Sequence, residues 1–453
     1  MYQLAILNGL IVEEDRIYRG NIYVDQEKIT AVTEPDTILE ADSILDVKGN
    51  YIFPGFIDVH SHLGDFTGEY EQPQYATAAA AVGGFTTCIE MPNTFPAVAN
   101  ADILREKAAG LSDLSFVDFA LYGALTKENQ CQLKELHDNG AISFKSFLSE
   151  GGRDFTSPDM YEAWIALKKI KEFNGLAAFH CEDFDITSDA YRHMQEFHLG
   201  TREAYNMSRP LLAEILATQN IIEVAKDTGC KIHICHVSHP YIASIIERYQ
   251  RMGVDVTGET CVHYLTYTED DFIEKGCLYK CAPPLRSKEA QNGLWKYLEK
   301  GVLLCVSSDH SCGPESLKDD TKRPTYETHN GISGIQTAVT VFYHEAVNKR
   351  GFSPTFLTKT MSANPARRWG IYGQKGSIQP GFDADLVIFD PNQEYTITSD
   401  ELYYLNKISA FVGYKGTGRP VMTLLRGQII ARDNVLCKDN RIGKQIFRNN
   451  YRR

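Results

Sequence analysis

Two histidines separated by a single residue, His60 and His62, follow an apolar run that Pro54 and Gly55 open. Side chains alternate along an extended chain, so both imidazoles point to the same side and can bind one cation. The same spacing also occurs in pairs of loop histidines that bind nothing. The apolar run in front of the pair favours the metal-binding interpretation.

Lys145 lies in the middle of another apolar run, AISFKSFL (141–148). An unpaired ammonium group is costly inside a protein, so such a lysine either extends its head group to solvent or has a chemical use. Carbon dioxide can convert a deprotonated lysine to a carbamate, whose two oxygens can bridge two divalent metals. The position therefore predicts either a lysine that reaches solvent or a metal-bridging ligand.

Three further polar residues follow apolar runs: His180 in AAFHCE, His236 in IHICHVS and Asp309 in VLLCVSSDHSCGP. Neutral imidazole suits zinc, cobalt or nickel and binds manganese more weakly. A single histidine at such a place is usually a core residue, and an aspartate there can equally cap a helix. Together with the first three residues, these side chains complete a candidate binuclear metal site.

The elements that must position these residues are apolar runs that alternate with helix-like segments. The runs are residues 56–60, 85–91, 116–123, 141–148, 175–182, 231–238, 255–265 and 302–310. Eight such repeats predict an α/β protein with a (β/α)8 TIM barrel, whose active site lies at the C-terminal ends of the strands. An open doubly wound sheet is the alternative, but the chain has neither G-x-G-x-x-G after the first strand nor GxxxxGK[ST].

Short strand-like runs occupy both ends of the chain. The first of them contains Asn8-Gly9, a turn signal, and similar runs return in GSIQPGFDADLVIFD and PVMTLLRGQII. Both termini therefore look like parts of one β-structure. We expect a small β-sandwich domain from residues 1–54 plus 373–453, and a metal-dependent barrel domain from residues 55–372.

The chain of 453 residues carries 59 acidic and 46 basic side chains, which gives a net charge of -13. This balance offers no electrostatic reason to bind nucleic acid or an anionic membrane. No basic region precedes an apolar core at the start of the sequence, so no secretion signal is expected, and no stretch is apolar enough to span a membrane. The eleven cysteines lack CxxC pairs, which favours reduced thiols in a cytoplasmic protein.

A set of segments together resembles one family. The segments are PGFIDVHSHL, AAVGGFTTCIEMPNTFP, GAISFKSFL, FHCED, CHVSHP, CAPPLRS, SSDHS and KGSIQPGFDADLVIFD. They are similar to the cyclic amidohydrolase branch of the amidohydrolase superfamily, which comprises allantoinases, hydantoinases and dihydroorotases. The resemblance covers nearly the whole chain, and it implies a (β/α)8 barrel with a small β-sandwich assembled from both termini.

The resemblance also implies a set of metal ligands. One divalent ion is held by His60, His62 and Asp309, the second by His180 and His236, and carboxylated Lys145 bridges the two. Zinc is the expected metal, with cobalt or manganese as alternatives. Metal-bound hydroxide opens a ring amide C–N bond, and Asp309 accepts its proton and delivers it to the leaving ring nitrogen.

The expected substrate is a five-membered cyclic ureide, allantoin or a 5-substituted hydantoin, and allantoin would place the protein in purine metabolism. No arginine follows His62 before Arg105, which disfavours dihydroorotate, whereas Asn93 in MPNTFP leaves a dihydroorotase of pyrimidine biosynthesis open. By analogy with the family, groups around Cys261 and around Asn330-Gly331 contact the ring imide. The same residues also fit a core thiol and a turn.

The variable loops at residues 64–74 and 151–155 are expected to shape the pocket.

Two other protein classes use this scaffold. A catalytically silent protein resembling dihydropyrimidinases lacks metal ligands, and here all six positions carry competent residues. A mononuclear deaminase would not need Lys145. The expected partners are a small cyclic amide as substrate and further copies of the chain. We expect a homodimer or homotetramer, because relatives commonly form such oligomers.

Overall fold

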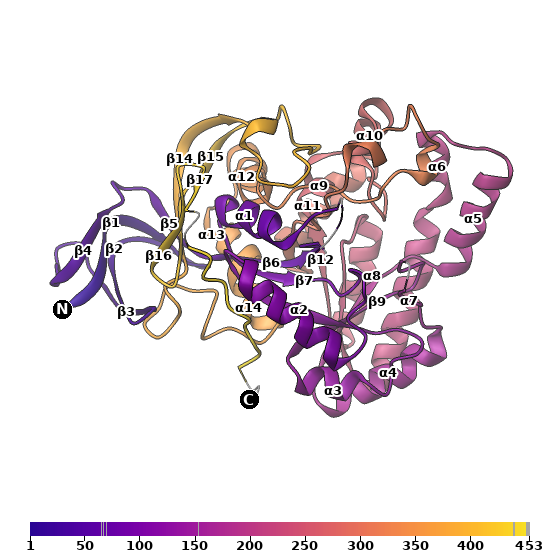
Figure 1. The fold of residues 1–453 in the computed structure, drawn as a ribbon, viewed down its shortest axis with the longest axis horizontal. Helices are drawn as coiled ribbons and strands as arrows, with labels where there is room; N and C mark the ends of the chain where they lie inside the picture. The colour runs from indigo at the N-terminus through magenta and orange to yellow at the C-terminus, as the bar shows by residue number, and fades with distance from the viewer. Residues whose placement is uncertain (65, 67, 69, 153, 438–439, 450–453) are drawn as a thin grey trace.

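The structure, a computed structural model, describes residues 1–449 apart from 65, 67, 69, 153 and 438–439. A small β domain that contains the N-terminus lies beside a larger α/β barrel (Figure 1). The helices α5 (Phe184–Glu196) and α6 (Arg202–Ser208) lie at the opposite end of the molecule from the β domain. The β domain and the helices α5 and α6 thus flank the barrel on opposite sides.

Parallel strands form the barrel in the order of the chain. They are β6 (Phe56–Ser61), β7 (Phe85–Glu90), β8 (Asp118–Ala124), β9 (Ala141–Phe147), β10 (Leu176–His180), β11 (Lys231–Ile234), β12 (Val256–Cys261) and β13 (Leu303–Ser307). The last strand meets the first through a bridge between Ser61 and His310, and the Ser308 backbone N–H donates to Asp58 Oδ1 at 3.0 Å. All eight predicted strands are present, so the predicted (β/α)8 barrel is confirmed.

Helices cover the outside of the barrel. They are α1 (Pro73–Gly83), α2 (Ala101–Leu114), α3 (Leu133–Asp138), α4 (Met160–Glu172), α7 (Leu211–Thr228), α8 (Pro240–Arg251), α11 (Lys288–Glu299) and α12 (Ala338–Tyr343), followed by the short helices α13 (Thr355–Thr358) and α14 (Asn364–Arg368). Two more short helices, α9 (Val262–Thr266) and α10 (Glu269–Lys275), follow β12. Gly84 and Gly229 end α1 and α7 in the left-handed conformation, as expected for glycine caps.

Both chain ends contribute to one nine-stranded, mostly antiparallel sheet. Its strands are β1 (Tyr2–Val12), β2 (Ile17–Asp25), β3 (Lys28–Thr33), β4 (Ala41–Asp46), β5 (Tyr51–Pro54), β14 (Leu386–Thr396), β15 (Lys415–Leu425), β16 (Gln428–Arg432) and β17 (Val435–Leu436). Strand β5 pairs with β14, with Ile52 opposite Ile388. The prediction that both termini build one β domain is therefore confirmed.

The prediction of a turn at Asn8-Gly9 is wrong. Strand β1 runs through both residues and accommodates them in a bulge, where its register against β2 shifts between Ile6 and Gly9. Asn8 has a φ of 62°, a conformation that asparagine adopts more readily than most residues. The bulge separates the half of β1 that pairs with β4 from the half that pairs with β5.

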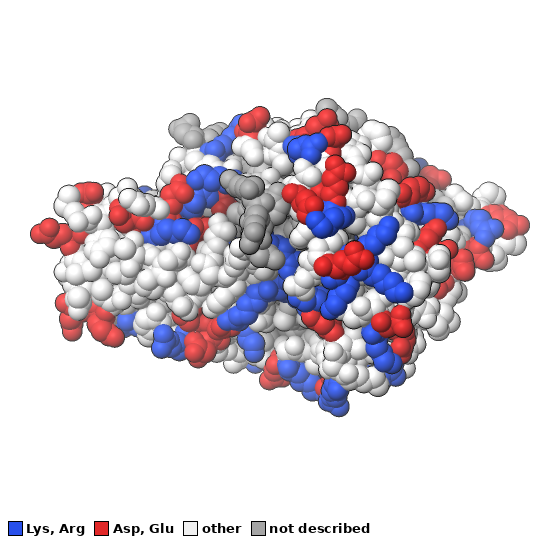
Figure 2. Space-filling model, turned by 90° about the horizontal axis from the view of Figure 1, so that it is seen from below, with Lys and Arg blue, Asp and Glu red and all other residues white. Residues whose placement is uncertain are grey.

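The floor of the barrel is apolar. A cluster of buried side chains from the strands packs there against Trp369, whose indole N–H donates to the Tyr122 hydroxyl at 2.8 Å. Polar site residues therefore lie above a dry, packed layer. On the face shown in Figure 2, the Lys and Arg side chains of the described residues are interspersed with Asp and Glu. Within the described part of the chain, no helix is long and apolar enough to cross a membrane.

Candidate metal centre and active site

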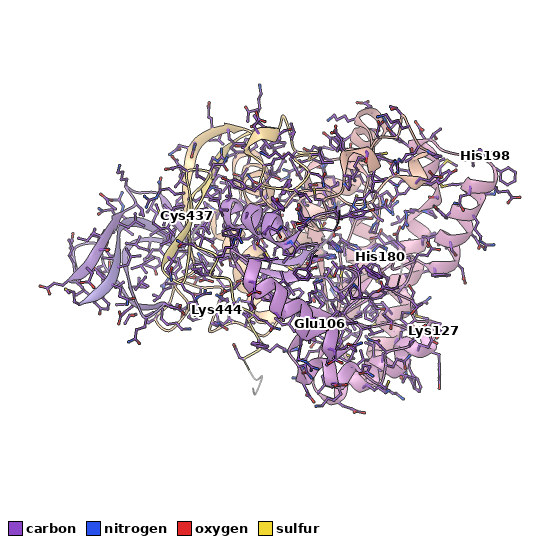
Figure 3. The ribbon with its side chains drawn as sticks, viewed as in Figure 1. Glu106, Lys127, His180, His198, Cys437 and Lys444 are labelled. Carbon is purple, nitrogen blue, oxygen red and sulfur yellow. The ribbon has the colours of Figure 1, made fainter. Side chains whose placement is uncertain are left out.

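The predicted metal ligands gather at the C-terminal ends of five barrel strands. His60 and Lys145 lie on β6 and β9, His180 ends β10, and His62, Asp309 and His236 follow β6, β13 and β11. Figure 3 shows His180 within the barrel, whereas His198 lies at the far end of the molecule, beyond α5. The strands thus bring together residues that are up to about 250 positions apart in sequence.

One half of the cluster is formed by the His-x-His pair and the aspartate. The Asp309 Oδ1 atom lies 3.2 Å from His60 Nε2 and 3.5 Å from His62 Nε2. Donor atoms of all three side chains lie within 4.8 Å of one another, which is close enough to surround one cation. His60 is 2% exposed and Asp309 is 8% exposed, whereas the His62 side chain is 22% exposed and faces the more open side of this half of the cluster.

The other half contains two histidines and the lysine. His180 Nδ1 faces His236 Nε2 at 3.1 Å, and the His236 ring lies 5.1 Å from the His60 ring, which joins the two halves. Burial, then the charges of His180 and Lys145, hold the pKa of His236 well below its usual value, so this imidazole is neutral. Lys145 is fully buried, with Nζ 4.8 Å from the Phe147 ring centre.

Two of these residues require unusual backbone conformations. His236 has a φ of 37° and Asp309 has a φ of 45°, a region that costs a non-glycine residue about 1–3 kcal/mol. His233, three residues earlier, hydrogen-bonds Thr257 Oγ1 at 2.7 Å and packs on Trp369 in the barrel interior. In an extended strand His236 would point to the opposite face from His233. The left-handed turn instead directs it into the cluster.

Two buried glutamates orient the histidines. His60 Nδ1 donates to Glu259 Oε1 at 2.6 Å, and His180 Nε2 donates to Glu182 Oε2 at 2.8 Å. These bonds leave Nε2 of His60 and Nδ1 of His180 free as ligand atoms. Burial raises the pKa of Glu259, but the charges and hydrogen bonds of His60 and His233 together outweigh burial and lower that pKa to about 2. Burial also raises the pKa of Glu182, but Arg209, His180 and Arg286 together outweigh burial and lower that pKa to about 2.

A cavity of about 330 Å³ opens onto the cluster. Of the predicted substrate contacts, Asn93, Asn330 and Gly331 line it, and the Asn93 Oδ1 atom is buried without a hydrogen-bond partner among the described residues. Cys261 does not line it: its side chain is fully buried, and its Sγ lies 3.4 Å from Ser307 Oγ. Only its backbone remains as a candidate contact.

The predicted pocket loops are partly described. Gly151 and Gly152 line the cavity, while residue 153 and three residues of the loop at 64–74 (65, 67 and 69) lie outside the described residues. The wall on the Asn330 side is held rigidly. The Tyr205 hydroxyl lies 2.9 Å from Asn330 Oδ1, and the Gly331 N–H donates to the Lys280 carbonyl at 3.0 Å.

Comparison with known proteins places this arrangement in a family. The model of the Amidohydrolase family matches residues 51–430, most of the chain. The chain belongs to the amidohydrolase family.

Curated relatives of this amidohydrolase match over nearly their full length. An allantoinase from Enterococcus faecalis is 36% identical over 440 residues, covering 94% of this chain and 95% of that protein. An allantoinase from Salmonella choleraesuis is 34% identical over 436 residues, covering 95% of each. The chain is thus similar to allantoinases from end to end.

Solved structures give the same result for the fold. The L-hydantoinase (dihydropyrimidinase) from Arthrobacter aurescens superposes with a TM-score of 0.96 at 31% identity, covering 99% of this chain and 100% of that chain. The dihydropyrimidinase from Brevibacillus agri superposes with a TM-score of 0.92 at 26% identity, covering all of both chains. The predicted cyclic amidohydrolase branch is therefore confirmed.

Amidohydrolases bind divalent metals, and the donor set of this chain fits them. Lys145 Nζ is buried and has no hydrogen-bond partner among the described residues. A buried polar group without a partner costs about 1–3 kcal/mol, and more if it is charged, unless a ligand satisfies it. Four imidazoles, one carboxylate and this lysine are a donor set that suits divalent transition metals.

Sequence reasoning missed several residues of the site. Glu182 and Glu259 stand inside the motifs FHCED and ETCVHYL, and a glutamate in an apolar strand is a signal that could have identified them. Arg209 lines the cavity and pairs with Glu182, yet it precedes a helix far from any motif residue. Only the fold brings it to the site.

Proposed function

We propose that this hydrolase of cyclic amide C–N bonds opens the ring of a five-membered cyclic ureide, allantoin or a 5-substituted hydantoin. The observation that carries the proposal is Lys145, whose buried Nζ has no partner beside His180 and His236. A mononuclear site has no use for such a lysine. The end-to-end similarity to allantoinases and to an L-hydantoinase supports the choice of ring.

The six residues would hold two divalent ions. One ion would lie among His60, His62 and Asp309, the second between His180 and His236, and Lys145, converted to its carbamate, would bridge them. Zinc is our choice of metal, with cobalt or manganese as alternatives. When bound, such ions polarise the ring carbonyl as Lewis acids and acidify a water molecule.

Asp309 moves the proton in this reaction. Its carboxylate takes a proton from the attacking water and returns it to the ring nitrogen as the C–N bond breaks. Glu259 and Glu182 keep His60 and His180 in the required tautomers throughout. The backbone of Asn330, which lies beside Gly331 on the cavity wall, holds the ring imide.

The test is a rate comparison on protein reconstituted with divalent metal and bicarbonate. Allantoin, 5-methylhydantoin and dihydroorotate are assayed in parallel, and bound metal is counted on the same sample. We expect about two metal ions per chain and fast turnover of a five-membered ring. Faster turnover of dihydroorotate would overturn the choice of ring and favour a dihydroorotase, for which Asn93 on the cavity wall is the supporting contact. Protein that binds no metal would instead be a silent scaffold.

The same proposal includes the setting in which the enzyme works. We expect a homodimer or homotetramer, which analytical ultracentrifugation distinguishes from a monomer. We also expect a cytoplasmic location, in agreement with the eleven free thiols of the chain, ten of them at least partly buried.

A further inference from the structure

Arg209 brings a guanidinium group to the wall of the active-site cavity. It follows α6, and its side chain is 20% exposed. Its Nη1 donates to Glu182, the glutamate that orients His180. No other side-chain hydrogen bond of Arg209 occurs among the described residues, so the rest of its five N–H donors remain for a ligand. The cavity therefore carries a fixed positive donor beside the metal ligands.

Glu150 brings an acceptor to the same cavity. It lies three residues beyond the end of β9, the strand that carries Lys145, and its side chain is exposed. Its carboxylate has no hydrogen-bond or ion-pair partner among the described residues. Its negative charge nevertheless acts on Arg209, because Glu150 is one of the charges that, with Glu182, raise the pKa of the Arg209 guanidinium. A donor and an acceptor of opposite charge thus line the same cavity.

We propose that Arg209 and Glu150 together recognise the substituent that the ring carries, and that they select the ureido group of allantoin over an apolar substituent and over the carboxylate of dihydroorotate. The inference rests on the function proposed above. A ureido group, –NH–CO–NH2, has one carbonyl acceptor and several N–H donors. Its carbonyl accepts from Arg209, and its terminal amide donates to Glu150.

The selection follows from what each competing substituent leaves unsatisfied. An apolar substituent displaces water from both charged groups and replaces none of its hydrogen bonds, and the loss is greater at Arg209, the less exposed of the two. A carboxylate substituent pairs with Arg209 but is repelled by Glu150. Sites built to hydrogen-bond a substrate group discriminate strongly against analogues that lack it. The ureido group alone satisfies both side chains.

The test measures kcat/KM of the metal-loaded protein for allantoin, 5-methylhydantoin and dihydroorotate, with metal counted on every sample. Glu150 is substituted rather than Arg209, because Arg209 also holds Glu182 in place. We expect the wild type to prefer allantoin, and Glu150→Gln to lower the allantoin to 5-methylhydantoin ratio about tenfold or more. Glu150→Lys should lower it further and raise the relative rate on dihydroorotate. The matched control is Glu196→Gln, an exposed glutamate on α5 that does not line the cavity.

The outcomes separate this inference from the proposed function. A wild type that opens 5-methylhydantoin faster than allantoin overturns the inference and leaves the proposed function intact. An unchanged substrate ratio in both Glu150 variants also overturns it. A metal-loaded protein that opens neither five-membered ring overturns the proposed function itself.

Discussion

Two fully buried lysines occupy opposite ends of the barrel and have opposite surroundings. Near the start of the strands, Lys375 Nζ lies 2.5 Å from Asp118, 2.9 Å from Asp383 and 2.6 Å from Asp385. Near the ends of the strands, Lys145 Nζ has no hydrogen-bond partner among the described residues. Among the described residues, the same side chain is therefore buried once with three carboxylate partners and once with no hydrogen-bond partner.

The difference in partners indicates a structural role for Lys375 and a functional role for Lys145. The three aspartates around Lys375 have the spacing of a metal site, but the lysine already supplies their positive charge. They join the barrel to the β domain, because Asp118 begins β8 and Asp385 immediately precedes β14. Lys145 makes no such connection. A buried charge that is fully paired stabilises a fold, whereas one left unpaired marks the place where a ligand belongs.

The largest expected effect is on Lys145. Lys145→Ala should lose bound metal and activity together, with turnover falling about a thousandfold or more, because the proposed bridging ligand would be missing. Metal analysis and the ring-opening rate of the same sample measure both. Added short carboxylic acids should restore part of the rate by replacing the carbamate. Full activity of Lys145→Ala without such acids would show that the bridging role is wrong.

The next effect separates proton transfer from metal binding. Asp309→Asn should retain much of the metal, because three or more other ligands remain, and should lose about 10²–10⁴-fold in kcat. The measurement is kcat together with the metal content of the purified variant. Loss of all metal with the activity would make Asp309 a structural ligand and not the acid/base.

At the other end of the barrel we expect a stability effect without a metal effect. Among the described residues, Lys375→Met removes the one cation that contacts all three buried carboxylates and leaves only Arg426 beside Asp118 and Lys28 beside Asp383. This loss should lower the free energy of unfolding by about 3–5 kcal/mol. Burial lowers the pKa of Lys375, but the carboxylates outweigh this and raise it above its ordinary 10.5, so the stabilisation is fully present at neutral pH. Denaturant titration measures it, and metal content per folded chain should not change. Loss of metal from folded Lys375→Met protein would contradict the purely structural role given to Lys375.

The last expected effect is a pH dependence of stability, and it concerns Lys280, a third buried lysine. Its Nζ donates to the carbonyls of Thr325 and Thr328 and has no carboxylate partner, and burial lowers its pKa from 10.5 to about 7. Between about pH 7 and 10.5 the unfolded chain binds a proton that the folded chain does not, so stability rises with pH.

The wild type should therefore gain stability relative to Lys280→Met as pH rises from 7 to 10, as measured by denaturant titration at each pH. The exposed Lys300 provides the control, because Lys300→Met should leave the pH dependence unchanged. Parallel curves for wild type and Lys280→Met would contradict the prediction.

Local patterns were sufficient for most of the fold. Apolar runs of strand length identify all eight barrel strands, because a strand buried on both faces is apolar along its whole length. They also locate His60 and Lys145, polar residues that interrupt such runs. They failed at Asn8-Gly9, because the same two residues suit a hairpin turn and a bulge, and only pairing with three other strands decides between them.

The sequence by itself determined the barrel, the two-ended β domain and the residue types of the candidate metal centre, because periodicity and burial are encoded locally. Only the tertiary structure decided which atoms meet. The left-handed turns at His236 and Asp309 persist because the surrounding strands hold them. Arg209 reaches the cavity from a connection between helices, and no local signal marks it. Contacts between distant segments depend on how the strands close the barrel, which is a property of the whole chain.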